Sequence, residues 1–218
     1  MEFNLFTFIF LFAILTSVLA LLWLNFRQDR AIKSSFNEVP EGFNETITLE
    51  DHQKAGHYTQ AKLLANHFEI IFSTIVLLIW TLGGAMNWLD IYWDERISDP
   101  ILLGTVFILS IMLIASFIDL PFSIYRNFIL EEKFGFNRMT IKTFIVDLIK
   151  EIILTLALGI PLVYSILYLM NMNSIGDYWW VYVWVILSIF TITMMWIYPT
   201  FIAPIFNKFK PLENNSLR

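Results

Sequence analysis

Cysteine is absent from this sequence of 218 residues, and charged residues are scarce, at 15% of the chain. The lack of cysteine excludes disulfides, iron–sulfur clusters, thiolate zinc sites and thiol nucleophiles. No long run of lysine or arginine occurs, so nucleic-acid binding has no support. Hydrophobic residues make up 57% of the chain and aromatic residues 17%. Since a soluble domain carries about 25% charged residues, this composition predicts a protein whose partner is the lipid bilayer.

Long apolar stretches occur five times along the chain. A membrane-spanning helix needs about 20 mostly apolar residues, whereas the strands of a membrane barrel are short and alternating. We therefore predict an all-α, polytopic membrane protein of about five transmembrane helices, with a cytoplasmic helical segment between the first two. The predicted spans, within a single membrane domain 1–218, are 3–26, 70–89, 101–118, 152–170 and 178–198.

The first span has a competing interpretation as a cleaved signal peptide, because residues 17–20 read SVLA. No basic residue precedes the span, however, and the apolar run continues to Phe26. Both features favour an uncleaved helix.

Basic residues are distributed unevenly between the connecting segments. Segments 27–67 and 125–151 carry five lysines and arginines each, the tail after the fifth span carries three, and the segments on the other side carry Arg96 alone. The positive-inside rule therefore predicts the N-terminus outside and the C-terminus in the cytoplasm. The chain is therefore predicted to be an integral, multi-pass membrane protein with this orientation, and the bacterial inner membrane is its predicted location.

The first cytoplasmic segment predicts a helix that runs directly into the second span. Thr48 with Asp51 resembles a capping box. One helical face then presents apolar and small side chains, namely Tyr58, Ala61, Ala65 and Phe68.

All three histidines lie in the same segment, at positions 52, 57 and 67. A helical zinc pair places two histidines four residues apart, and these are separated by five and ten. They are interpreted as polar interfacial side chains, so no metal-ligating and no catalytic residue is predicted.

The second cytoplasmic segment concentrates charge around a glycine. Gly135 between two phenylalanines predicts a tight turn. The alternative interpretation of this charged segment is a simple ion-paired connection between two membrane helices. Asn137 or Thr140 is expected to cap the next helix. Pro121 is expected to kink or end the third span. Asp119 lies near membrane depth with no local partner, which makes it a candidate for lining a polar cavity.

Two further features concern the fourth span and the tail. Asp147 and Lys150 are three residues apart and are expected to neutralise each other. In the tail, Pro199, Pro204 and Pro211 are expected to prevent a long continuous helix.

Three motifs in order resemble the zinc-dependent CAAX prenyl protease family in its N-terminal membrane region. They are EEKFGFNRMT at 131–140, IYPTFIAPIFNKFKPLE at 197–213 and VPEGFNETITLEDHQKAGHYTQAK at 39–62. The residues that match the family turn and the family lead-in to the protease domain are Glu132, Phe134, Gly135, Phe136, Asn137, Thr140, Pro199, Pro204, Phe206 and Asn207.

The resemblance implies membrane helices around a water-filled chamber, closed by a metalloprotease domain with zinc on an H-E-x-x-H motif and a later glutamate. This sequence contains no H-E-x-x-H. The protease domain expected after residue 218 is absent, so the chain is read as truncated or split and as inactive alone. Zinc is expected only with that domain, supplied downstream or in trans. The matched residues are given structural or interdomain roles.

Two other functions remain open at this point. One is a stand-alone membrane scaffold that kept the helices and lost the enzyme. The other is a small transporter, although no inverted repeat is visible between the two halves. We further expect the turn at 131–140 to dock on the lead-in at 197–209, with Phe134 and Phe136 as anchors.

Overall fold

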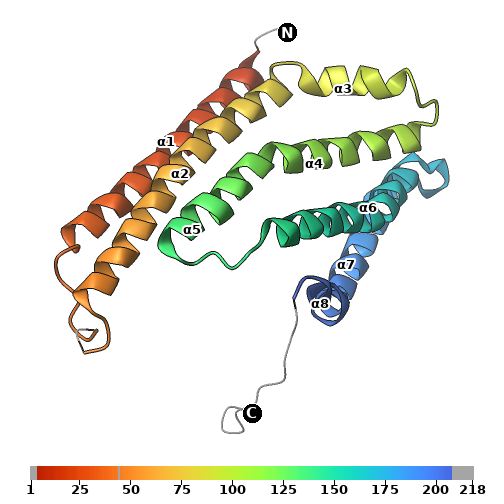
Figure 1. Cartoon of the computed structure of the whole chain (residues 1–218). Helices are drawn as coiled ribbons and strands as arrows, with labels where there is room; N and C mark the ends of the chain where they lie inside the picture. The colour runs from red at the N-terminus through yellow and green to blue at the C-terminus, as the bar shows by residue number, and fades with distance from the viewer. Residues whose placement is uncertain (1–3, 44, 208–218) are drawn as a thin grey trace. The chain divides into compact units, whose positions relative to one another are not determined.

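The computed structural model describes residues 4–43 and 45–207. These residues form helices and connecting segments, without strands (Figure 1). Within this described part, five helical runs are long and apolar enough to cross a membrane, which confirms the predicted all-α, five-helix architecture. Their bounds are Leu5–Ser34, Leu49–Thr81, Pro100–Phe134, Ile141–Asn171 and Gly176–Phe206.

The chain divides into two compact units. The first contains the chain up to Tyr92 together with Ser116–Met139, and the second contains Trp93–Ala115 together with the chain from Thr140. Large apolar side chains are widely exposed in both; Phe6 and Met195, for example, are each 75% exposed. An apolar surface of this extent is suited to lipid rather than to water.

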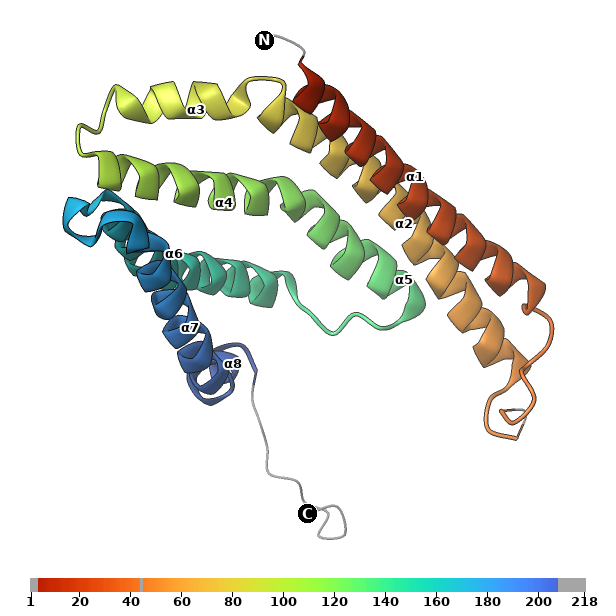
Figure 2. The same ribbon diagram turned by 180° about the vertical axis from the view of Figure 1, so that it is seen from behind.

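The first unit is built on an antiparallel pair of helices, α1 (Leu5–Ser34) and α2 (Leu49–Thr81), which lie side by side in Figures 1 and 2. Asn4 caps α1 by accepting a hydrogen bond from the Thr7 backbone N–H at 3.0 Å. Thr48 caps α2 in the same way from Asp51 at 3.1 Å. The predicted helix start after Thr48 and the continuation of this helix into the second apolar stretch are therefore confirmed.

Small and buried residues bring α1 and α2 together. Leu63 on α2 is only 7% exposed. A Cβ atom at Gly56 would lie 3.0 Å from the Phe36 ring, so glycine allows the chain after α1 to approach closely. At the boundary between the polar and apolar parts of the two helices, the side-chain amides of Asn25 and Asn66 meet at 3.4 Å.

The predicted end of the second span, Leu89, is wrong. Helix α2 ends at Thr81, and a separate helix α3 covers Ala85–Asp94. The cause is the glycine pair between them, because Gly84 has a positive φ of 82° that other residues rarely adopt.

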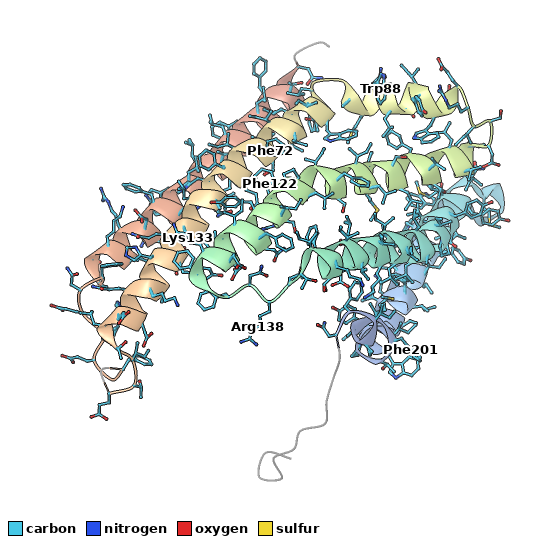
Figure 3. All side chains as sticks on the ribbon, in the orientation of Figure 1. Phe72, Trp88, Phe122, Lys133, Arg138 and Phe201 are labelled. Atoms are coloured by element: carbon cyan, nitrogen blue, oxygen red, sulfur yellow. The ribbon has the colours of Figure 1, made fainter. Side chains whose placement is uncertain are left out.

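The third span is longer than predicted. Helix α4 (Pro100–Ile124) passes through Pro121 and continues as a π-helical segment, η1 (Tyr125–Leu130), and as the short helix α5 (Glu131–Phe134). In η1 the hydrogen-bond ladder widens, since the Glu131 N–H donates to the Arg126 carbonyl five residues back. Phe72 on α2 and Phe122 pack with ring centroids 5.0 Å apart (Figure 3).

Gly135 ends α5 in the left-handed conformation, with φ at 78°. The N–H groups of Phe136 and Asn137 both donate to the Glu131 carbonyl, at 2.9 and 3.2 Å. The tight turn predicted at this glycine is confirmed, and it follows the common left-handed helix ending.

The second unit contains the first part of α4, helix α6 (Ile141–Asn171), the 3-10 segment η2 (Asn173–Tyr178) and helix α7 (Trp179–Ile197). Glycines allow α4 and α6 to approach closely: a Cβ at Gly104 would lie 2.9 Å from Leu167, and one at Gly159 would lie 2.9 Å from Leu109. Thr140 caps α6 by accepting from the Thr143 N–H at 3.1 Å, as one of the two predicted caps.

The expectation that prolines break the chain after the fifth span is wrong up to Phe206. Helix α7 continues as the π-helical η3 (Tyr198–Ile202) and as α8 (Ala203–Phe206). Pro199 and Pro204 each lie at the first or second position of a new segment, where a missing N–H is tolerated. Lys208, Phe209, Lys210 and Pro211, together with the rest of the predicted lead-in, lie outside the described residues.

Candidate functional site

Tyr58 organises the turn that follows α5. The rings of Phe134 and Phe136 contact the Tyr58 ring edge to face, with centroids 5.2 and 5.1 Å away. The Tyr58 hydroxyl donates a hydrogen bond to the Glu131 carboxylate. Each such aromatic pair contributes about 0.5–1.5 kcal/mol beyond its buried area, so the three aromatic residues fix the turn against α2.

Tyr58 lies twelve residues before Ile70, where the uncharged, apolar part of α2 begins. Its hydrogen bond to the negatively charged Glu131 carboxylate raises the pKa of Tyr58 above its usual range. Tyr58 therefore stays protonated, and a donor, throughout the neutral pH range.

The turn residues matched to the family motif hold one another as well. The Asn137 side-chain amide donates to the Glu132 carboxylate at 2.9 Å, and its oxygen accepts from the Met139 N–H at 2.8 Å. The Arg138 side chain points away from the ribbon (Figure 3). Asn137 thus stabilises its own turn, and Thr140, not Asn137, caps α6.

The turn at 131–140 was expected to dock on the lead-in at 197–209. In the structure, each of these two segments has contacts within its own unit. Phe134 and Phe136 contact Tyr58, a residue that the sequence argument did not consider for this role. In the second unit, the Lys150 ammonium donates to the Ile205 carbonyl at 2.8 Å and lies 5.4 Å from the Phe206 ring centroid. The predicted pairing of Lys150 with Asp147 is confirmed at 3.0 Å.

A polar cavity of about 350 Å³ lies beside this turn, between α1, α2 and the η1–α5 region. Arg126 forms an ion pair with Glu69 at 3.3 Å on its wall, and both side chains are partly exposed. Lys62 and Glu131 also line it. The Asn25 side chain is 9% exposed, and its amide nitrogen is buried without a hydrogen-bond partner among the described residues.

Asp119 lies on the surface of α4 with an exposed side chain. It is not among the residues that line the polar cavity. Its predicted role in a polar cavity remains a prediction.

The histidines are engaged separately. A ring nitrogen of His52 lies 2.8 Å from the Ser35 carbonyl oxygen, and His57 makes an edge contact with Phe36. Over residues 4–43 and 45–207, no three histidine, aspartate or glutamate side chains converge as a metal-binding group.

Sequence reasoning missed the bond between Tyr58 and Glu131 and the cavity around Asn25. A signal for the first was present, because Tyr58 lies on the helical face that also carries Ala61 and Ala65. Its partner is 73 residues away in the sequence, and no periodicity relates residues so far apart. Asn25 stands inside an apolar stretch near its end, and an isolated polar residue there is an indication of burial.

Comparison with known proteins identifies relatives that all belong to one family. Residues 28–208 match the family described as CAAX prenyl protease N-terminal, five membrane helices. The CAAX prenyl protease 1 homolog of Dictyostelium discoideum is 36% identical over 199 residues, which cover 88% of this chain and 45% of that protein. The Caenorhabditis elegans homolog is 36% identical over 196 residues, covering 90% of this chain and 43% of that protein.

A solved structure agrees with the sequence comparison. The crystal structure of S. mikatae Ste24p aligns with a TM-score of 0.80 and 28% identity, covering 93% of this chain and 48% of that one. The chain therefore spans a little under half the length of the proteins it matches. Given the family match over most of the sequence and five helical runs of membrane-spanning length, the chain belongs to the family of CAAX prenyl protease N-terminal membrane regions.

Proposed function

We propose that this chain is the membrane part of a CAAX prenyl protease-like zinc metalloendopeptidase and that it forms part of the wall of a chamber in which membrane-associated peptides are cleaved. The observation that carries the proposal is the family match over residues 28–208, combined with the five membrane-capable helices. The proteases named among the relatives are about twice as long as the matched segment. Their activity comes to this chain only as part of the proposal.

Zinc does not fit the residues that the structure describes. The sequence has no H-E-x-x-H, and among the described residues no three histidine, aspartate or glutamate side chains converge as metal ligands. A catalytic zinc site needs three protein ligands and an open position for water. We therefore derive no catalytic step from this chain, and propose that a protease domain, downstream or in trans, supplies both zinc and the activating residue.

The turn at 131–140 is the proposed contact for such a domain. Tyr58 fixes one side of it, while the Phe136 ring remains 51% exposed and Arg138 points outward. An aromatic side chain beside an arginine is typical of the energetically important part of a protein interface. In the second unit, Asn207 ends α8 and lies at the end of the described lead-in.

A split-protein assay tests the proposed function. We expect membranes that contain the 218-residue chain alone to leave a farnesylated CAAX peptide uncleaved and to hold no stoichiometric zinc. Co-expression with the remaining C-terminal part of the Dictyostelium discoideum relative should restore both zinc and cleavage. The control is the same C-terminal part expressed without this chain.

Two results would contradict the proposal. Cleavage by the chain alone, or zinc that survives dialysis and is lost in His57→Ala, would mean that this chain carries its own metal site. Equal activity of the C-terminal part with and without the chain would mean that the chain does not contribute a membrane wall and would favour the stand-alone scaffold.

We also propose that the turn faces the cytoplasm, with the N-terminus outside. The distribution of lysine and arginine supports this orientation. Reporter fusions after Arg30 and Lys142 are expected to give cytoplasmic signals, and fusions after Asp94 and Asp177 signals from the opposite side. A non-cytoplasmic signal at Lys142 would reverse the assignment. The relatives named above are eukaryotic, so the bacterial inner membrane remains a prediction.

A further inference from the structure

The polar cavity of the first unit adjoins an apolar one along the same pair of helices. The second cavity, of about 410 Å³, lies between α1 and α2 and is lined by apolar and small side chains, among them Leu21 and Ile70. Leu21 is one turn from Asn25 on α1, and Ile70 is one turn from Asn66 on α2; both asparagines line the polar cavity. The two cavities therefore follow one another along an amphipathic groove.

The change from polar to apolar occurs at the same level on both helices. On α1 the uncharged stretch ends at Phe26, and on α2 it begins at Ile70. The contact between Asn25 and Asn66 places these two transitions side by side. This level is where lipid headgroups meet acyl chains, so the polar cavity lies at headgroup depth and the apolar cavity at chain depth.

Asn25 forms part of the wall of the polar cavity. Its side chain is nine-tenths buried, and its oxygen accepts a hydrogen bond from the Asn66 side-chain amide at 3.4 Å. Its amide nitrogen is itself buried and has no partner among the described residues.

The charges of the cavity have both signs. Lys62 lies over the Tyr58 ring, 5.1 Å from its centroid, and forms no ion pair within the part of the chain that the structure describes. Glu131 is close by, because it accepts the Tyr58 hydroxyl. Arg126 and Glu69 neutralise each other on the same wall. A zwitterionic ligand therefore matches the cavity better than an anion or a cation.

We propose that this groove binds one phosphatidylethanolamine molecule. Lys62 donates to its phosphate, Glu131 accepts from its ammonium group, and one acyl chain follows the apolar cavity past Leu21 and Ile70. The polar cavity falls within the range of about 300–1,000 Å³ typical of small-molecule pockets. Phosphatidylcholine is the discriminating alternative, because its trimethylammonium group has no N–H to donate to Glu131.

Native mass spectrometry of the full chain tests the proposal. The protein is purified in detergent, stripped of lipid and incubated with phosphatidylethanolamine, phosphatidylcholine and phosphatidylglycerol of identical acyl chains. We expect a one-to-one phosphatidylethanolamine adduct at least five times as abundant as either competitor. The variant Lys62→Gln should lower this adduct at least threefold, while Lys142→Gln, which changes an exposed lysine in the first turn of α6, should leave it unchanged.

A second pair of variants addresses the apolar part of the groove. Ser17 lines the apolar cavity and the adjacent Thr16 does not, so Ser17→Phe should fill it and displace the lipid, whereas Thr16→Phe should not. Circular dichroism spectra confirm that each variant keeps its helices. Equal binding of the three lipids, or an adduct insensitive to both Lys62→Gln and Ser17→Phe, overturns the proposal. Retention of phosphatidylglycerol alone overturns the zwitterionic assignment. None of these outcomes depends on proteolytic activity.

Discussion

Replacing Tyr58 with alanine is expected to destabilise the first unit by about 2–4 kcal/mol. The change removes two edge-to-face aromatic contacts, worth about 0.5–1.5 kcal/mol each, and a hydrogen bond to a charged acceptor, worth about 1.5–3 kcal/mol when well shielded. The side chain is partly exposed, which places the total below the sum of these values. Tyr58→Phe, which keeps the ring and loses only the hydroxyl, should cost less than Tyr58→Ala.

The measurement is unfolding in SDS followed by tryptophan fluorescence, with hydrogen exchange of the amides of 131–139 as a local probe. Exchange there should accelerate in Tyr58→Ala, because Phe134 and Phe136 lose their shared partner. Phe68→Ala is the matched control, since Phe68 is on the same helix and is 65% exposed. If Tyr58→Ala and Phe68→Ala unfold alike and exchange at 131–139 is unchanged, Tyr58 does not hold the turn.

Replacing Leu130 with alanine is expected to cost about 2–5 kcal/mol, the usual range for removing a buried leucine. Leu130 is only 3% exposed and ends the π-helical segment η1 beside the polar cavity. The neighbouring Ile129 is in the same segment and is 56% exposed. Ile129→Ala is therefore the control and should change the stability by about 0.5 kcal/mol or less.

The same SDS titration measures both variants. The cost of a buried leucine-to-alanine change depends on the cavity it leaves. If the two variants lose stabilities that differ by less than about 1 kcal/mol, Leu130 does not pack as the structure places it.

The features predicted well from the sequence are those with a local cause. The start of α2 at Thr48 and the left-handed turn at Gly135 each follow from a few adjacent residues, and the structure confirms both. The length of the apolar runs was also enough to identify five spans. Their ends were less accurate, because hydropathy does not register that Gly83 and Gly84 separate α2 from α3.

The proline residues show why local rules were insufficient elsewhere. Pro121 was expected to kink or end the third span, and the helix does not end there. Pro199 was expected to interrupt the chain after the fifth span, yet helical structure continues past it. A single-sequence argument treats proline as a lost N–H and a steric clash. It does not anticipate that a π-helical segment will follow or include the proline and carry the chain onward.

The candidate site was only partly accessible from the sequence. The motif at 131–140 drew attention to Phe134 and Phe136, but their contact with Tyr58 depends on how α2 packs against α5. The polar cavity depends on three separate segments, and its orphaned amide at Asn25 is visible only once burial is known.

The π-helical segment η1 determines which residues reach Tyr58. A wider turn of this kind arises when a single residue is inserted into an α-helix, and each residue of an α-helix advances the side chains by about 100°. If the same residues of η1 followed α-helical spacing instead, Glu131 and Phe134 would be turned by about 100° about the helix axis, away from Tyr58. The rotation that η1 gives to the residues after it, and not only the identity of the turn residues, therefore decides whether Glu131 and Phe134 contact Tyr58.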